Sequence, residues 1–471
     1  MTVDIEWIDL SKNGHGTDET RIKVRSHAMK ATAAMRRRTG TWGDDGAYTD
    51  IGHTANTRLT STMFPARLPA AKINPPMPLS GVELLAAEIG IHILDLSALT
   101  EIQCGWTACA ILASQRDCVK GLVSFRPPSY LHCVASRYGS SAYLDEALRC
   151  VAIRAKRVLA PSYQSFDEIE SRQYVTALRS LQKAVDDIEE RIRPDVLCAV
   201  NLLSLFELLY FTRQGAWALH TAGAYRLIRV RGPESFVSDF DIRLLLSMAT
   251  PITHECLRKN EPCCFEEDSW QNMLQLFVVA TEPFSSRSQL AISLIRIMVR
   301  GPRLVRDVRV LIGRHDTEEQ PGPEQLKKQL RDYRKELLQW RAEYDSAALM
   351  MPSRGEIPAP NEDIRSELLA TCYGLFIICC RLMSAISTDL IEILEDEAVT
   401  HARRMIELEN DISPVNRWAS FYICQKLVVA RATLATTDIW REVSRKADFT
   451  GIVEEDRFEA WWSVIVGLVP E

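Results

Sequence analysis

Histidine and cysteine, the residues best suited to metal binding and nucleophilic chemistry, show no ligand spacing in this sequence. The chain has nine histidines and thirteen cysteines. It contains neither H-E-x-x-H nor C-x-x-C, the spacings that let one turn of chain hold a metal. His254 and Cys256 would point about 200° apart on a helix. We therefore predict no metal site, no cofactor, and reduced cysteines packed as small apolar residues in an intracellular protein.

Acidic residues are plentiful, but they form no catalytic set. The runs "DDIEE" at 186–190 and "EDE" at 395–397 could bind Mg²⁺ with a diphosphate, although a solvated helix face explains them better. Neither G-x-S-x-G nor a glycine-rich phosphate loop occurs. The remaining acid–base candidates are His220, His254 and Glu207, which lie in or beside apolar helices where burial shifts pKa values. We assign no catalytic residue, and enzyme activity is the less favoured interpretation.

Charge counting indicates that the segment 21–38 is the only concentrated basic element in an otherwise acidic chain. It holds seven cations and no acid, whereas the whole chain has a formal net charge of −6, so the other residues carry −13. The segment could bind a nuclear import receptor, contact nucleic-acid phosphates, or pair with the acidic body of the protein. It lacks aromatic residues for stacking on single-stranded bases. The seven cations are Arg21, Lys23, Arg25, Lys30, Arg36, Arg37 and Arg38.

Composition along the chain indicates an all-α protein with an irregular start. We expect a basic leader at 1–60, without a secretory signal, and a linker at 61–80, where five prolines exclude a helix. Residues 81–471 show helical periodicity nearly throughout and no convincing strand alternation. They predict one large body of antiparallel helices, with a possible break between two lobes near 350–363.

Three segments show the helical pattern best. Over 165–192, Ser165 and Glu168 form a capping box, and apolar residues follow at 174, 178, 181, 185, 188 and 192. Pro194 should end that helix and begin the next. From Pro323, one apolar stripe comprises Leu326, Leu330, Tyr333, Leu337, Trp340 and Tyr344. The third pattern is a pair of helices over 361–386 and 388–411.

Two apolar runs, 196–211 and 368–380, suggest buried helices. Asn201 and Glu207 interrupt the first run, and the second is shorter than the roughly 20 residues that a bilayer crossing needs. We predict no membrane contact. These helices could line a cavity for a small hydrophobic ligand, or they could simply form core.

Two motifs carry a resemblance to a known family. The first combines "IEWIDL" with Val24, Arg25, Ser26, His27, Met29 and Arg36–Arg38. The second is "WALHTAGAYRLIRVRGPESF" at 217–236, which holds Trp217, His220, Gly223, Ala224, Arg231, Gly232 and Pro233. "HECLRKNEPCCFEEDSW" then ends in an acidic-Trp element. Together they resemble fungal-specific transcription factor-like proteins. The resemblance is to the helical regulatory region, which in that family usually follows a six-cysteine zinc cluster.

The resemblance implies nuclear work in transcription. His220, Gly223 and Ala224 would suit a tight helix crossing, and Arg231, Gly232 and Pro233 would end the helix. A second "RGP", at 300–302, has the same form of a helix stop. No cysteine precedes residue 104, so the zinc-cluster module is absent and its usual base contacts are missing.

Three functions remain open. The first is a nuclear transcription regulator without a zinc cluster, which acts through protein partners or a small ligand. Its contact with DNA would be weak or indirect, and a secondary-metabolite pathway is one candidate for what it regulates. The second is a helical protein that binds a small hydrophobic ligand and has no nuclear role, which would place it in the cytoplasm. The third is an enzyme of fungal secondary metabolism, such as a cyclase, built on the same helical fold.

Overall fold

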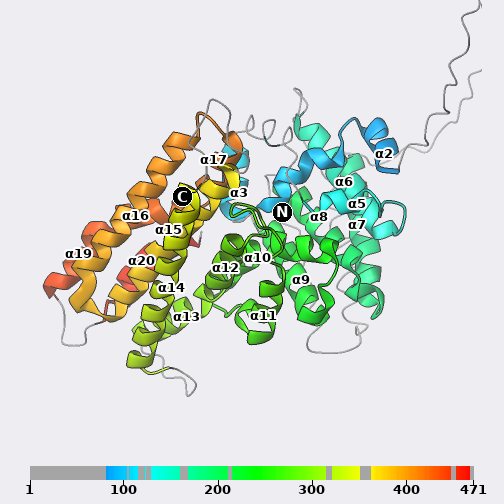
Figure 1. Cartoon of the computed structure of the whole chain (residues 1–471). Coiled ribbons are helices and arrows are strands. Elements are labelled where there is room, and N and C mark those ends of the chain that lie inside the picture. Colours follow the sequence, from blue (N-terminus) through cyan, green and yellow to red (C-terminus); the bar gives the residue numbers. More distant parts are fainter. Residues whose placement is uncertain are drawn as a thin grey trace, which may run out of the picture. The chain divides into compact units, whose positions relative to one another are not determined.

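The protein is all-α, as the periodicity predicts. A computed structural model describes residues 81–102, 105–114, 122, 129–159, 168–210, 215–313, 321–350, 362–446 and 452–466. This part of the chain contains about 18 α-helices, five short 3₁₀ helices and no strand (Figure 1). Contacts group residues 80–471 into one compact unit. The predicted leader at 1–60 and linker at 61–80 lie outside the described residues.

The first half of this unit is built around a group of four consecutive helices, α6–α9. Its central member is α8, which packs against the other three and is buried at every position from 196 to 209. Pro194 begins α8, as predicted. The elements of this half are α2 (Gly81–Ile89), η1 (Ile93–Glu101), α3 (Gly105–Ser114), α5 (Leu131–Val134), α6 (Ala142–Leu159), α7 (Glu168–Asp186), η2 (Glu190–Ile192), α8 (Pro194–Tyr210) and α9 (Ala216–Arg231).

The apolar stripe predicted over 165–192 is wrong at its end. Helix α7 stops at Asp186, and the short η2 turns the chain toward α8. Ile188 and Ile192 therefore leave the buried face and are 65% and 49% exposed. The predicted capping residue Ser165 lies outside the described residues.

A middle set of shorter helices follows. Its elements are η3 (Pro233–Ser235), α10 (Asp239–Lys259), η4 (Cys264–Glu266), α11 (Asp268–Leu276), α12 (Gln289–Met298) and α13 (Gly301–Ile312). The two "RGP" sequences behave differently here. Gly232 ends α9, as predicted, whereas Gly301 and Pro302 form the first turn of α13 after α12 has already ended at Met298.

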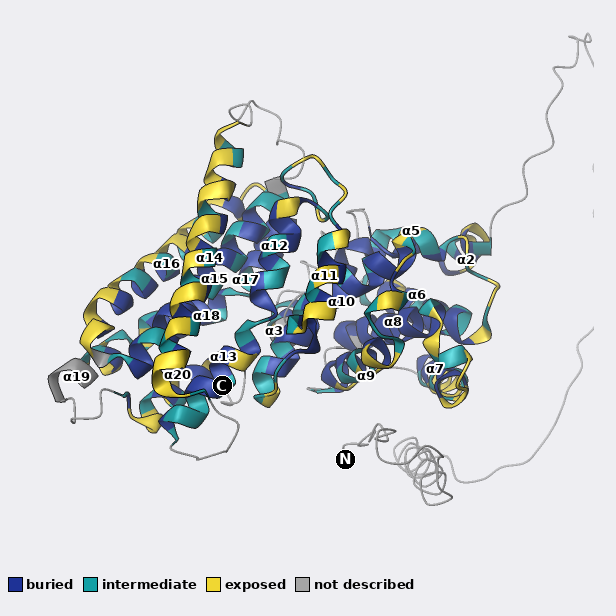
Figure 2. Ribbon diagram, turned by 60° about the horizontal axis from the view of Figure 1, so that its bottom comes forward, coloured by how far each residue is buried: buried dark blue, intermediate teal, exposed yellow. Residues whose placement is uncertain are grey.

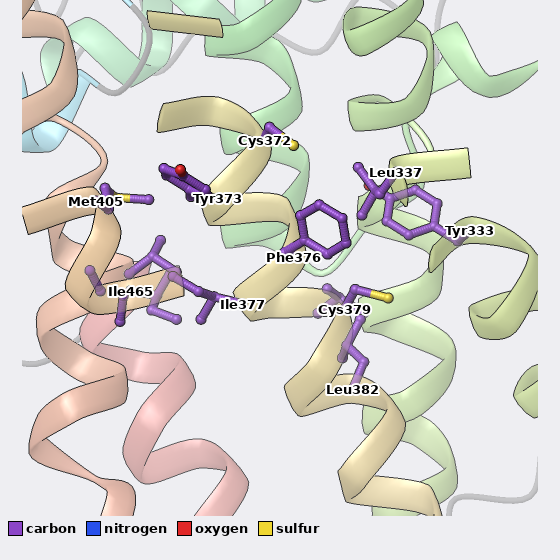
Figure 3. Close-up of a cluster of buried hydrophobic side chains, with 14 of the residues drawn as sticks. Tyr333, Leu337, Cys372, Tyr373, Phe376, Ile377, Cys379, Leu382, Met405 and Ile465 are labelled. Carbon is purple, nitrogen blue, oxygen red and sulfur yellow. The ribbon is translucent and has the colours of Figure 1, made fainter. Parts of the chain in front are cut away.

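The last helices surround α15, which is the centre of the larger hydrophobic core. Figure 3 shows Phe376 pointing toward Tyr333 and Leu337 of α14, while Ile377 points to the opposite side, toward Ile465. The full predicted stripe of α14 is buried. The elements are α14 (Pro323–Leu349), α15 (Glu362–Ile386), η5 (Thr388–Leu390), α16 (Ile391–Ile412), α17 (Arg417–Cys424), α18 (Leu427–Ala435), α19 (Thr437–Lys446) and α20 (Glu455–Ile465).

Helix α15 is longer than the apolar run at 368–380 suggested. Over Asp363–Ile386 it is long and apolar enough to span a membrane by length and composition, and 78% of its apolar window is buried inside the protein. Most of the predicted lobe break at 350–363 lies outside the described residues, but the flanking helices α14 and α15 pack against each other. The lack of membrane contact remains a prediction.

Early and late parts of the sequence meet at α17. Tyr422 donates a hydrogen bond to the carbonyl oxygen of Ala98, and Thr107 donates to the carbonyl of Gln425 at 3.0 Å. Helix α17 also packs on α3. Exposed and buried residues alternate around the outer helices of this unit (Figure 2).

Candidate functional site

Five buried polar side chains meet at one end of the α6–α9 group. Antiparallel neighbours place the end of one helix beside the start of the next. Late positions of α6 and α8 therefore lie at the same level as early positions of α7 and α9. The five residues are Arg154 of α6, Glu170 and Tyr174 of α7, Glu207 of α8 and His220 of α9.

Tyr174 links two of the three predicted acid–base candidates. Its hydroxyl donates a hydrogen bond to Oε1 of Glu207 and lies 3.1 Å from Nε2 of His220. The ring of Tyr174 stacks on Phe206, with centroids 4.5 Å apart. Because the phenol gives its only proton to Glu207, we assign the donor in the second contact to His220.

An ion pair lies next to this chain of hydrogen bonds. Arg154 and Glu170 are 3.3 Å apart, and their side chains are 0% and 1% exposed. The Nε of Arg154 also donates to the carbonyl of Leu209 at 3.1 Å. Glu170 precedes Tyr174 by one helical turn. The pair and the Glu207–Tyr174–His220 chain thus form one buried polar layer, which we call the α6–α9 polar layer.

Burial controls the protonation of this layer. It lowers the pKa of His220 to about 3, so the imidazole is neutral at pH 7. Burial, followed by the nearby carboxylates of Glu170 and Glu207, raises the pKa of the Cys150 thiol well above its usual value. The layer therefore holds a neutral imidazole, a phenol and a carboxyl group in one hydrogen-bonded chain, while Cys150 stays an unreactive thiol.

His254, the third candidate, lies half-buried on α10 and not on α6–α9. Tyr174 was predicted only as a member of the apolar stripe of α7. A buried tyrosine usually needs a hydrogen-bond partner for its hydroxyl. By this rule, Tyr174 could have been predicted from the sequence as a polar residue of the site. In the described part of the chain, no three His, Cys, Asp or Glu residues are placed to hold a metal.

The motif residues of α9 are mostly buried, but one expectation about them is wrong. Trp217, His220 and Ala224 are 6%, 2% and 0% exposed. A Cβ built on Gly223 would have no described atom within 4 Å. Gly223 therefore does not sit at a tight helix crossing, because small residues are needed there only when another backbone comes close.

Arg231, Gly232 and Pro233 form a sharp corner after α9. Gly232 has φ +71°, a conformation that favours glycine, and Pro233 opens η3. The side chain of Arg231 is 2% exposed and lies 2.6 Å from Asp241 of α10. Its guanidinium stacks over Phe236 at 4.4 Å. Arg231 thus joins α9 to α10 and is not placed to meet an external phosphate.

The acidic-Trp element packs onto this corner. Trp270 contacts Phe236, with ring centroids 5.9 Å apart, and Phe265, at 5.2 Å. Tyr225 of α9 packs edge-on to Phe265 and accepts a hydrogen bond from the backbone N–H of Cys264 at 2.8 Å. Residues 217–236 and 254–270, which are separate in sequence, therefore form one continuous aromatic cluster.

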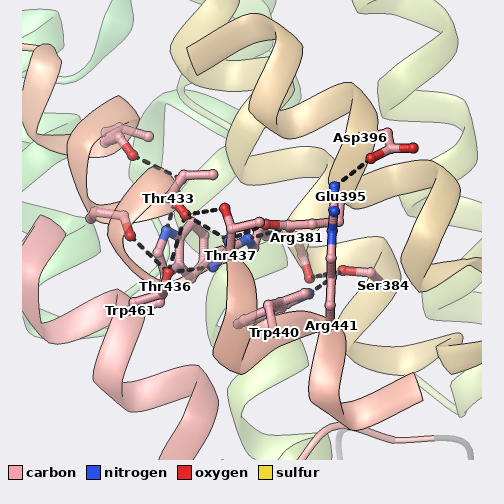
Figure 4. A network of polar contacts seen from close by, with 12 residues as sticks. Arg381, Ser384, Glu395, Asp396, Thr433, Thr436, Thr437, Trp440, Arg441 and Trp461 are labelled. Atoms are coloured by element: carbon pink, nitrogen blue, oxygen red, sulfur yellow. Dashed lines mark hydrogen bonds and ion pairs between the residues drawn. The ribbon is translucent and has the colours of Figure 1, made fainter. Parts of the chain in front are cut away.

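A second buried ion pair, unpredicted from sequence, lies among the last helices (Figure 4). Arg381 of α15 binds both carboxylate oxygens of Glu395 of α16. It also donates to Thr436 at 2.8 Å and lies between Trp440 and Trp461, whose ring centroids are 4.2 and 5.3 Å from the guanidinium carbon. An arginine inside the apolar run "IICCRLM" was the available signal. Its donors are used within the protein, so the network ties helices together.

The basic residues of 21–38 and His27 lie outside the described residues. Their predicted roles are therefore unchanged. They remain the predicted contacts to an import receptor or to phosphate.

Comparison with known proteins gives one distant similarity. A stretch of 98 residues is 28% identical to "Uncharacterized protein AN5342" of Emericella nidulans, and it spans 21% of each chain. No protein-family model matches the chain. No solved structure matches it.

Proposed function

We propose that this protein is a nuclear, transcription-factor-like regulator that lacks a zinc-cluster module and acts through protein partners or a small ligand. This proposal rests on how two stretches that resemble the family, residues 217–236 and 254–270, pack against each other. They meet at the turn that follows α9. There Arg231 pairs with Asp241 and stacks on Phe236, which contacts Trp270. The motifs that resemble the regulatory family are therefore used for the architecture of the helical body. An all-α fold is also what the resemblance implies.

The test of this function is the location and the transcriptional effect of the tagged protein. We expect a fluorescent fusion to accumulate in the nucleus, and Arg36→Ala/Arg37→Ala/Arg38→Ala to reduce that accumulation. Replacing the exposed Arg172, Arg179 and Lys183 of α7 with alanine removes the same charge from a described helix and serves as control. Nuclear exclusion of the unmodified protein, or identical location of all variants, would argue against the proposal.

A second candidate function is an enzyme or ligand-binding protein of secondary metabolism. The α6–α9 polar layer favours it, because ionisable side chains that gather in a buried place and carry a shifted pKa are typical of functional sites. Gene deletion followed by parallel metabolite and transcript profiles separates the two functions. Loss of one compound with unchanged transcripts supports the enzyme. A group of transcripts that falls together supports the regulator.

A further inference from the structure

Helix α14 carries a second concentrated basic element. Residues 327–335, "KKQLRDYRK", hold five cations and one acid. The prediction that 21–38 is the only such element is therefore wrong. These cations lie on the polar face of an amphipathic helix, and periodicity alone does not show which charges of such a face have partners.

Two of the five cations are neutralised by nearby carboxylates. Lys327 pairs with Glu324 at 3.0 Å, and Arg334 binds both oxygens of Glu397 on α16. The other three, Lys328, Arg331 and Lys335, are exposed and form no ion pair with any described residue. Asp332, the acid of this stretch, also pairs with none of them. We call these three residues the α14 basic stripe.

The stripe lies along one side of α14, whose buried side chains anchor it in the core. Its members are three and four residues apart, so they share a face, and α14 shows exposed residues along its outer side in Figure 2. The opposite face is held in the core by Leu330, Tyr333 and Leu337. Seven residues of helix rise about 10 Å, and one strand of B-DNA carries about three phosphates over that axial length. Three cations thus match a short run of regularly spaced phosphates.

The composition of the stripe favours a duplex over other anionic partners. Stacking on single-stranded bases requires exposed aromatic side chains, and Tyr333, the aromatic residue of this stretch, is 5% exposed. Insertion into a lipid surface requires apolar residues beside the cations, whereas the exposed members of 327–335 are all charged. Exposed cations without partners can release counterions when they meet phosphates.

We propose that the α14 basic stripe contacts the phosphate backbone of double-stranded DNA without reading its sequence. This inference rests on the proposed nuclear function and deepens it, because it gives the helical body a DNA contact of its own. The acidic charge elsewhere in the chain keeps this contact local and sensitive to salt. Sequence choice would then come from a partner protein and not from α14.

Fluorescence anisotropy of the full-length protein tests the proposal. The probe is a labelled 20-base-pair duplex of mixed sequence, titrated at several salt concentrations from 50 to 200 mM. Each phosphate contact contributes about 0.9 to the slope of log affinity against log salt. Lys328→Gln/Arg331→Gln/Lys335→Gln should therefore reduce that slope by about 2 to 3. The substituted side chains are exposed, so circular dichroism should show an unchanged fold.

A matched control removes the same charge from another surface. Arg179 of α7 and Arg226 and Arg229 of α9 are exposed and form no ion pair with described residues. Arg179→Gln/Arg226→Gln/Arg229→Gln should leave the slope within about half a unit of the unmodified protein. Equal slopes for all three proteins, or equal losses in both variants, would overturn the proposal.

Two further results distinguish DNA binding by the stripe from lipid binding and from the proposed nuclear function. Stripe-dependent binding to vesicles containing phosphatidylserine, without stripe-dependent binding to the duplex, would replace DNA by a lipid surface and overturn the proposal. If the protein does not accumulate in the nucleus, the proposed function is wrong. The slope of log affinity against log salt, measured in vitro, would still show whether the stripe binds phosphates. The two failures are therefore distinguishable.

Discussion

At the scale of single residues, the polar positions of α8 behave in opposite ways. Glu207 accepts a hydrogen bond from Tyr174. Asn201 is 3% exposed, and neither polar atom of its amide has a hydrogen-bond partner among the described residues. A buried amide without partners costs about 1–3 kcal/mol. Both residues interrupt the same apolar run in the sequence, so only their surroundings distinguish them.

Asn201→Leu should stabilise the protein. Leucine has a similar volume and removes the unpaired amide, so the free energy of unfolding should rise by about 1–2 kcal/mol. Urea denaturation monitored by circular dichroism would measure this. Asn272→Leu, on the exposed side of α11, should change stability by less than about 0.5 kcal/mol. A less stable Asn201→Leu variant would show that a bound water or ligand satisfies the amide.

His220 should make the protein sensitive to acid. Its pKa is lowered to about 3 in the folded state, whereas an unfolded histidine has a pKa near 6.5. Its contribution to stability is therefore complete above pH 6.5 and is lost as the pH falls toward 3, by about 1.4 kcal/mol for each unit. His220→Gln should flatten the decline in unfolding free energy between pH 6.5 and 4.5. An equally steep decline in His220→Gln and in the control His401→Gln would contradict this.

At the scale of elements, three helix ends marked by glycine or proline were predictable, whereas Gly301 and Pro302, predicted to stop a helix, begin α13. Pro194, Gly232 and Pro323 begin or end helices as the sequence indicates. The end of α7 was missed, because the apolar spacing continues through Ile188 and Ile192 without a strong breaker. Backbone preferences act locally, so they determine ends only at such residues. Elsewhere tertiary packing decides where a helix stops.

Two glycines of the same motif should respond oppositely to alanine. Gly232→Ala forces a Cβ into φ +71°, which should lower the free energy of unfolding by about 1–2 kcal/mol. Gly223 lies inside α9 with open space at its Cβ position, so Gly223→Ala should raise it by about 0.5–1 kcal/mol. Thermal unfolding of both variants checks the pair. If Gly223→Ala destabilises the protein, the prediction that Gly223 lies at a tight helix crossing is supported after all.

At the scale of the whole molecule, two buried polar centres lie at different places in the sequence. The α6–α9 polar layer joins helices of the first half. The pair Arg381–Glu395 joins α15 and α16 and, through Thr433 and Thr436, the C-terminal end of α18. Removing one partner of a buried ion pair leaves an unpaired charge in the core and strongly lowers stability, although replacing both partners by apolar groups is often tolerated. These centres therefore constrain how the helices pack together.

Arg381→Ala should be among the most damaging single substitutions. It leaves the carboxylate of Glu395 unpaired in the core, and both side chains are 0% exposed, so stability should fall by about 3–5 kcal/mol. Arg441→Ala removes the exposed pair with Asp396 and should cost less than about 1 kcal/mol. If Arg381→Ala leaves no folded protein, Arg381→Leu/Glu395→Leu should recover it. Similar losses in Arg381→Ala and Arg441→Ala would contradict the role of the buried pair.

The all-α class, the buried stripe of α14 and the helix ends at Pro194, Gly232 and Pro323 could be read from the sequence alone. Periodicity and backbone preference are local properties, so they can be read without the fold. The packing of helices determines that Tyr174 joins Glu207 to His220. It also determines that, among the described residues, Asn201 has no hydrogen-bond partner and Lys328 is one of three cations of α14 without an ion pair. Those outcomes depend on which distant helix lies opposite, and contacts across 33 or 46 residues leave no periodic trace.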